Sequence, residues 1–197
     1  MFRFVVLVML VALCLSANAL AQWGTPAPSA TTAPAKSSPV STTSAATSIK
    51  DIDALRSAVI DAWGKMPLTI QRAIFVTRPA SAIGDWTERT SNVFKSGEDI
   101  HTYVEPVGYT WKPNGDMFNF GVNVDFVLKE ADGKILGGQE NFSHTTLTNH
   151  MKVQEFFLNL NLSPHGLPAG KYVVEYTLHD QGSDKVAKFA LPFTISE

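Results

Sequence analysis

The segment from Met117 to Leu128 constrains the fold most, because its residues alternate between apolar and polar types with a period of two. One face carries only apolar side chains, namely Phe118, Phe120, Val122, Val124, Phe126 and Leu128. Such alternation is typical of a half-buried antiparallel strand, with one face on a core and the other toward solvent. The chain is therefore expected to contain an antiparallel sheet.

Further segments show the same period, so we expect strands near residues 135–142, 156–162, 172–178 and 189–195, with weaker patterns over 70–76 and 99–105. Asp132-Gly133 predicts a hairpin turn, and Gly137-Gly138 suggests a bulge in the strand that follows. No helical pattern follows Pro67. About seven or eight strands with turns at roughly ten-residue spacing predict a mainly β fold, an antiparallel sandwich with Greek-key connections. A small barrel is the alternative.

A single amphipathic helix is predicted before the strands. Ser48 and Asp51 have the spacing of a capping box, and Gly64 and Pro67 provide a stop. One face between them is apolar, formed by Ile52, Leu55, Val59, Ala62, Trp63 and Met66. We expect a helix over about 49–65, as part of a helical segment 49–66, that packs against the following domain at 67–197. A partner-binding helix is the alternative.

The first residues predict a targeting segment. A short positive start, an apolar run and the Ala19-Leu20-Ala21 ending are typical of a secretory signal peptide at 1–21. The alternative is a membrane anchor, although a spanning helix needs about 20 apolar residues. Residues 22–48 are rich in Ala, Pro, Ser and Thr, which predicts a disordered linker or, alternatively, a glycosylated stalk.

Composition limits the classes of function. The formal net charge of −2 argues against a nucleic-acid partner, which would require a basic surplus. The single cysteine, Cys14, falls within the predicted signal peptide, and Leu13 before it argues against a lipid-modified cysteine. After cleavage no cysteine and no transmembrane segment would remain. Core packing must then supply stability, and thiol catalysis and cysteine-ligated metals are excluded.

Three sequence motifs resemble those of immunoglobulin-like and fibronectin-like domains. The segment from Leu167 to Tyr172 resembles the turn that opens a late strand, in which a tyrosine hydroxyl bonds back to the chain. The last strands, ending in residues 189–195, resemble the C-terminal hairpin of bacterial secreted modules, and Phe94 to Glu98 is similar to their Phe-x-x-Gly-Glu turn. The chain looks like exported, uncharacterised bacterial proteins with one such C-terminal module. The resemblance implies an immunoglobulin-like fold and no particular chemistry, and the core cysteine pair of antibody domains is missing.

No catalytic constellation is apparent in the sequence. Ser143-His144 lacks the Gly-x-Ser-x-Gly context of a nucleophile, and adjacent Glu98 and Asp99 would face opposite sides of a strand. Five histidines are scattered through the chain, and none shows a strong ligand spacing. His144 and His150 form the one weak candidate metal pair. We therefore expect no enzyme, no cofactor and no dedicated metal site.

Loop aromatics next to polar side chains suggest a ligand site. Aromatic rings beside amide and carboxylate groups can bind a glycan or a peptide, and the candidates are Trp86, Tyr109, Trp111, Asn114 and Asp116. The alternative is that these rings cover the ends of the core.

These observations together predict an exported, non-enzymatic interaction module of the cell envelope, periplasmic or secreted, that binds another protein. The runner-up is a binder of carbohydrate or another small ligand through the loop aromatics. Weak metal binding through the histidines ranks third.

Overall fold

The computed structural model describes residues 48–197. The signal peptide predicted at 1–21, with Cys14, and the linker predicted at 22–48, apart from Ser48, lie outside the described residues. Helix α1 spans Ile49–Lys65 and begins with the predicted capping box. The Ser48 hydroxyl accepts the Asp51 N–H at 3.3 Å, and the Asp51 carboxylate accepts the Ser48 N–H at 2.7 Å. No helix within this described range has the length and apolar run needed to cross a membrane.

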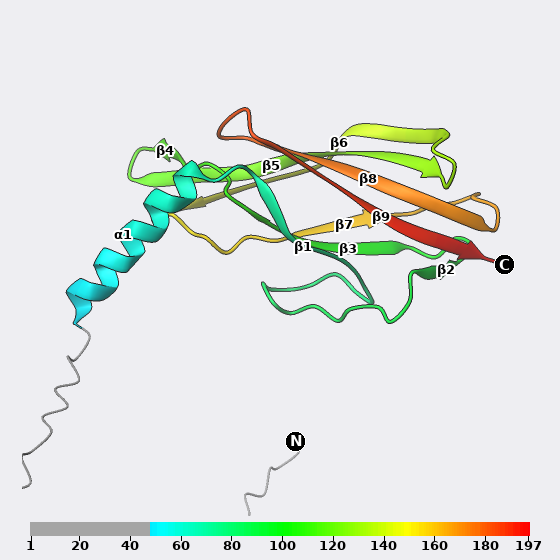
Figure 1. Ribbon diagram of the computed structural model, residues 1–197, viewed down its shortest axis with the longest axis horizontal. Coiled ribbons are helices and arrows are strands. Elements are labelled where there is room, and N and C mark those ends of the chain that lie inside the picture. Colours follow the sequence, from blue (N-terminus) through cyan, green and yellow to red (C-terminus); the bar gives the residue numbers. More distant parts are fainter. Residues whose placement is uncertain (1–47) are drawn as a thin grey trace, which may run out of the picture. The chain divides into compact units, whose positions relative to one another are not determined.

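Nine strands follow the helix, in two sheets (Figure 1). The first sheet has the order β1-β3-β7, and the second has the order β2-β9-β8-β5-β4 with β6 also paired to β5. The bounds are β1 Thr69–Val76, β2 Val93–Lys95, β3 Ile100–Val107, β4 Lys112–Asn114, β5 Met117–Glu130, β6 Ile135–Asn149, β7 Leu158–Leu162, β8 Gly170–Asp180 and β9 Val186–Ser196. All pairs are antiparallel except β2 with β9, which is parallel.

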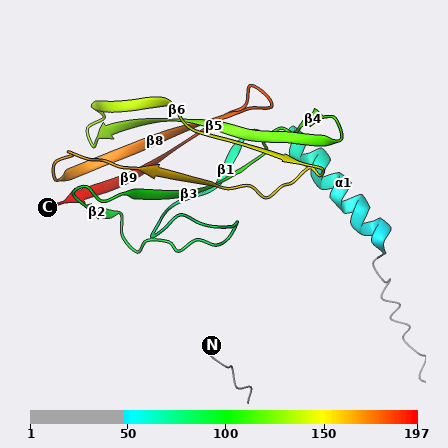
Figure 2. The same ribbon diagram turned by 180° about the vertical axis from the view of Figure 1, so that it is seen from behind.

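This strand order is that of an immunoglobulin-like domain. Apart from the three-residue strands β2 and β4, one sheet holds β1, β3 and β7, and the other holds β5, β6, β8 and β9, as Figures 1 and 2 show from opposite sides. The mainly β, immunoglobulin-like fold class is therefore confirmed. We call residues 67–197 the β domain.

One hydrophobic core lies between the two sheets, with buried side chains from both. In β5 the alternation read from the sequence holds, since Phe120, Val122 and Val124 are buried and Asn123 and Asp125 face outward. In β8 the Tyr172 hydroxyl donates to the Pro168 carbonyl at 2.8 Å, which is the predicted tyrosine corner.

Two features of the strands differ from expectation. β6 extends to Asn149, well beyond the expected end at Phe142, because its pairing with β5 continues to that residue. Its residues after Thr145 are exposed on both faces of the strand. Its second half therefore shows no alternation of apolar residues. β2 and β4, with three residues each, are too short to show any period.

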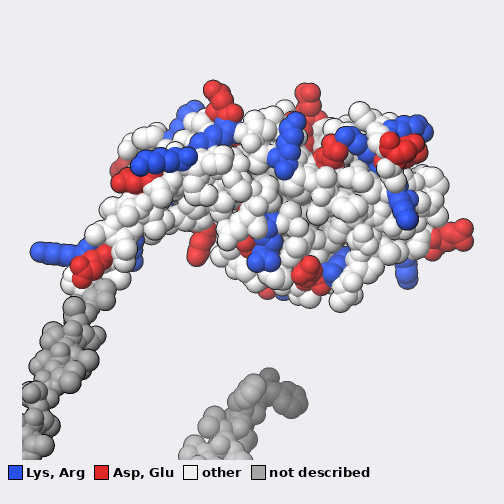
Figure 3. All heavy atoms as spheres, viewed as in Figure 1, with Lys and Arg blue, Asp and Glu red and all other residues white. Residues whose placement is uncertain are grey.

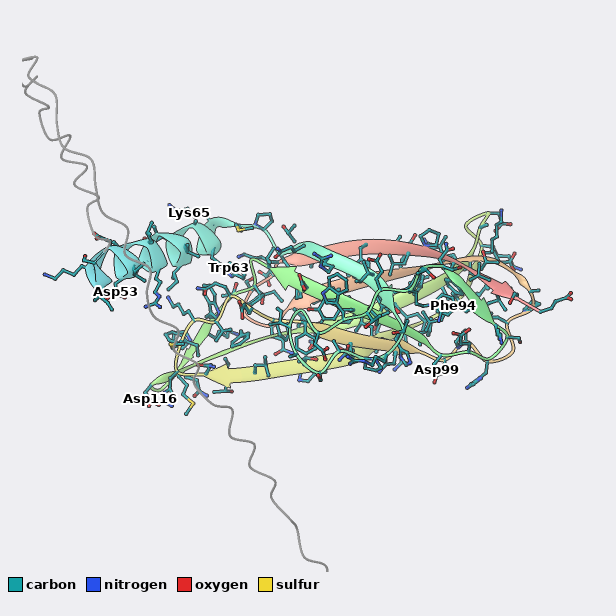
Figure 4. All side chains as sticks on the ribbon, turned by 90° about the horizontal axis from the view of Figure 1, so that it is seen from below. Asp53, Trp63, Lys65, Phe94, Asp99 and Asp116 are labelled. Atoms are coloured by element: carbon teal, nitrogen blue, oxygen red, sulfur yellow. The ribbon has the colours of Figure 1, made fainter. Side chains whose placement is uncertain are left out.

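Helix α1 attaches to the β domain through its last turn. Trp63 is its one buried residue, with 8% of its surface exposed. Its Nε1 donates to the Tyr109 carbonyl at 2.8 Å, and its ring stacks on Trp111 at 5.4 Å. Gly108 has φ +80°, and a side chain there would collide with the Pro67 carbonyl just after the helix. The last turn is therefore held closely, and Figure 4 shows Trp63 against the β domain with Asp53 far along the helix.

Within residues 48–197 nothing covers the rest of the apolar helix face, so the prediction that the helix packs on the β domain holds only for its last turn. Ile52, Leu55 and Val59 are 38%, 62% and 51% exposed. The reason is that the aromatic cluster at the end of the β domain accommodates one turn, and the earlier turns extend past it (Figure 1). Amphipathic spacing predicted the face but could not identify what covers it.

Candidate functional site

The predicted ligand-binding residues do not form one surface. Tyr109 is fully buried, and its hydroxyl donates to the Val153 carbonyl at 2.9 Å. Burial raises the pKa of this phenol well above its ordinary value. Trp111 is half-buried beside Trp63, and its Nε1 donates to the same Val153 carbonyl at 2.9 Å. Both rings pack against Trp63 in the last turn of α1.

Trp86 belongs to a different cluster. Its ring lies 6.3 Å from that of Tyr103, and the Arg72 guanidinium lies 4.6 Å above it. Asn114 at the end of β4 and Asp116 in the turn before β5 are both exposed, and Asn114 donates to the Asn119 side chain at 3.3 Å. The structure thus brings Tyr109 and Trp111 together and places Trp86 apart from them. A ligand-binding role for these residues stays a prediction.

The histidines do not form the weak metal pair suggested by the sequence. His144 bonds to the Asn123 side chain at 2.6 Å, whereas His150 lies 3.5 Å from Asp116. Six residues of extended chain separate the two histidines by about 20 Å. Within residues 48–197 no three His, Cys, Asp or Glu side chains come together as a metal site.

A polar network that sequence reasoning missed covers the outer face of β5, β6 and β8. His144 on β6 and His179 on β8 both lie directly opposite Asn123 on β5. Next to them, Asp125 accepts the Asn141 N–H and an His179 ring nitrogen, each at 2.8 Å. The Asn141 N–H, followed by His179, lowers the pKa of Asp125.

This network fixes a bulge in the exposed edge strand β6. Gly137 and Gly138, where the sequence suggested a bulge, pair in register with β5; the register shifts on both sides of them, and Asn141 in the larger shift has φ +52°. The Asp125 carboxylate occupies the bulge by bonding the Asn141 N–H. Bulges interrupt strand edges and disfavour pairing with another chain. This edge of the sheet is therefore poorly suited to strand addition.

The open edge lies along β9, where it faces β1. Between these strands runs a cleft of about 610 Å³, lined by residues 68–73 and 186–191 and continued by a smaller space of about 270 Å³ that reaches residues 88–92. We call this space the cleft. Its apolar lining comes from side chains half-buried against the core, namely Ile70, Ala73, Phe189 and Leu191. β1 and β9 flank the cleft and are not hydrogen-bonded to each other as strands.

Hydrogen bonds at the end of β9 show which backbone groups point into the cleft. The Thr194 N–H donates to the Asn92 carbonyl, and the Pro192 carbonyl accepts from the Asn92 side chain, both at 3.0 Å and both away from β8. Pairing with β8 has no register shift, so outward groups recur at every second residue. Lys188 and Ala190 therefore direct their N–H and C=O groups outward. β2 pairs with β9 only at 194–196, beyond these residues.

On the face seen in Figure 3, Lys and Arg side chains are interspersed with Asp and Glu. The cleft combines two basic side chains, Arg72 and Lys188, with its apolar lining. Neither the cleft nor the exposed helix face assembles a nucleophile with a base. What the cleft offers is apolar side chains beside a row of backbone donors and acceptors. That combination can bind an extended chain.

Comparisons with known proteins identify no family. No family model matches the chain, and no curated protein matches it. Solved structures give distant likenesses. An alkylpurine DNA glycosylase of Pseudomonas fluorescens bound to DNA is 13% identical with a TM-score of 0.39, over 73% of this chain. This chain spans only 36% of the length of that enzyme.

Two smaller proteins are also distantly similar. A Niemann-Pick type C2 protein from the Japanese carpenter ant is 11% identical with a TM-score of 0.43, over 66% of this chain and 94% of its own. A CARDB domain from Pyrococcus furiosus in complex with di-metal ions is 15% identical with a TM-score of 0.30, over 67% and 90%. At these TM-scores the likenesses assign no site.

The prediction that the protein is not an enzyme is corrected by the first likeness, since the matched protein is an enzyme. The missing catalytic motifs do not justify that exclusion. The likeness to the glycosylase, at a TM-score of 0.39, gives no activity to this chain either.

Proposed function

We propose that this protein is an exported interaction module of the cell envelope, periplasmic or secreted, that binds another protein at the cleft. The secretory pattern at 1–21 supports export, and the resemblance to exported bacterial proteins with one immunoglobulin-like module supports the location. The partner contributes an extended segment with apolar side chains at alternate positions.

The observation that carries this proposal is the free edge of β9 beside the apolar cleft. Lys188 and Ala190 offer main-chain groups with the spacing of a strand, and Phe189 and Leu191 offer apolar contacts between them. In recognition by strand addition, main-chain bonds supply affinity and alternate side chains supply specificity. An extended segment satisfies both sets of groups at once.

Crosslinking in the producing cell tests the proposal. A photoreactive residue replaces Lys188 at the cleft or, as the control, exposed Lys112 on β4. We expect one dominant envelope protein attached at position 188 and not at 112. The same background at both positions would refute the proposal.

A backbone variant makes this test specific. Ala190→Pro removes the outward N–H without disturbing β8, just as Pro192 already occupies the equivalent place two residues on. Ala190→Val keeps the N–H and serves as the matched control. We expect the adduct to disappear in A190P and persist in A190V; an adduct that persists in folded A190P contradicts the strand-addition mode.

A further inference from the structure

The exposed face of α1 has the spacing of a coiled-coil seam. Its apolar residues Ile52, Leu55, Val59 and Ala62 follow one another at intervals of three, four and three. They therefore fall on alternating a and d positions of a heptad repeat. We call these four residues the apolar stripe. All four are exposed in the isolated chain.

The residue types favour two parallel strands. β-branched Ile52 and Val59 occupy the a positions, and Leu55 occupies a d position. This distribution favours parallel two-stranded coiled coils over higher oligomers. An identical helix offers the same stripe, so the seam is complementary to itself.

Charges beside the stripe support a second copy as the occupant. Asp51 lies at a g position and Arg56 at the e position five residues later, so a parallel pair places Asp51 of each chain opposite Arg56 of the other. In the single chain Arg56 lies 3.3 Å from Asp53, and both side chains are largely exposed, so Arg56 is accessible to a partner. Each of the two interchain pairs thus joins a negative Asp51 to a positive Arg56.

The docking of Trp63 on its own β domain is compatible with this seam. Trp63 occupies the next e position and is held by its own β domain. The g residue that a parallel partner places opposite it is Ala58, a small side chain. A bulkier residue there would compete with the docked tryptophan.

The charge of the helix argues against a membrane surface as the alternative occupant. α1 carries three basic and three acidic side chains, namely Lys50, Arg56, Lys65, Asp51, Asp53 and Asp61. Helices that lie on anionic membranes carry an excess of Lys and Arg on their polar face. This helix has no such excess.

We propose that two copies of this protein associate through the apolar stripe as a short parallel coiled coil, leaving the two clefts free. Two heptads bury little area, so the dimer is weak and the fraction of chains in it rises with protein concentration. This inference uses a different surface from the proposed function, and either can fail without the other.

Sedimentation velocity of the protein purified after export, over a hundredfold range of concentration, tests the inference. We expect a monomer–dimer equilibrium whose dissociation constant rises at least tenfold in Leu55→Asp. The matched control is Ser57→Asp, which adds the same charge on the opposite, polar side of α1 and leaves the equilibrium unchanged. A monomer at every concentration, or equal weakening in both variants, overturns the inference.

Single cysteines test the orientation. In a parallel seam d positions meet across the interface, so Leu55→Cys is expected to form an intermolecular disulfide under mild oxidation, whereas Ser57→Cys is not. Binding to vesicles of phosphatidylglycerol and phosphatidylethanolamine tests the membrane alternative. Vesicle binding that Leu55→Asp abolishes, without a dimer in solution, overturns the inference in favour of a membrane.

Discussion

The two uncovered apolar regions of this protein, the apolar stripe on α1 and the cleft beside β9, differ in what their backbones offer. In α1 the main chain bonds to itself, so the stripe can recognise a partner only through side-chain shape and charge. At the cleft, Lys188 and Ala190 direct main-chain groups outward. The stripe therefore suits a matching helix, whereas the cleft suits an extended strand. Exposed Leu55 on the stripe contributes little to the stability of the monomer, whereas buried Trp63, which anchors α1, contributes much.

The largest expected effect concerns the support of the stripe. Trp63→Ala removes a buried ring and its bond to the Tyr109 carbonyl, and we expect a loss of about 3–5 kcal/mol in the free energy of unfolding. Trp63→Phe keeps a ring and loses the N–H, with an expected loss of about 1 kcal/mol. Urea denaturation followed by circular dichroism measures both. A Trp63→Ala loss below about 1 kcal/mol would mean that the helix is not anchored as described.

The next effect distinguishes the two sides of β9. Leu191 pairs with Val174 at a position whose N–H faces β8, so Leu191→Pro is expected to cost about 3 kcal/mol or more. Ala190→Pro is expected to cost less than about 1 kcal/mol, since its N–H faces the cleft. Thermal melting of both variants checks this. Equal destabilisation would show that the edge at Ala190 is not free.

A smaller effect is expected at the opposite edge of the same sheet, where Asp125 holds the bulge in β6. Asp125→Asn is expected to lower stability by about 1 kcal/mol at pH 7. The pKa of Asp125 is lower in the folded than in the unfolded state, so its contribution is present above the unfolded pKa, about 4. It is lost as pH falls through the folded pKa. A difference between wild type and variant that grows on acidification would contradict this assignment.

The smallest effect is expected on the stripe itself. Leu55 is 62% exposed, so Leu55→Ala should change the stability of the monomer by less than about 0.5 kcal/mol. The measurement is urea unfolding at concentrations too low for dimerisation. A loss above about 1.5 kcal/mol would mean that Leu55 is covered within its own chain.

Much of the fold could be predicted from local patterns. The capping box at Ser48 and Asp51, the alternation in β5 and the tyrosine corner at Tyr172 each depend on residues close in sequence. The second half of β6 could not be predicted in this way, because most of its side chains are exposed on both faces and so leave no apolar period.

The site was predicted less well, since burial and strand order are tertiary properties. Residue type could not show that Tyr109 is buried under α1 while Trp86 lies in another cluster. The cleft exists because β1 and β9 are not paired with each other in the sheets, and the order of strands along the sequence does not reveal which strands pair. Amphipathicity located the stripe but wrongly suggested that the β domain covers it.

Co-purification after in-cell crosslinking, with two differently tagged copies of the protein, tests whether the cleft and the stripe are separate binding surfaces. We expect Ala190→Pro to lose the foreign envelope protein and keep the second copy, and Leu55→Asp to lose the second copy and keep the foreign protein. Loss of both partners in either folded variant, or of none in both, would contradict two separate surfaces.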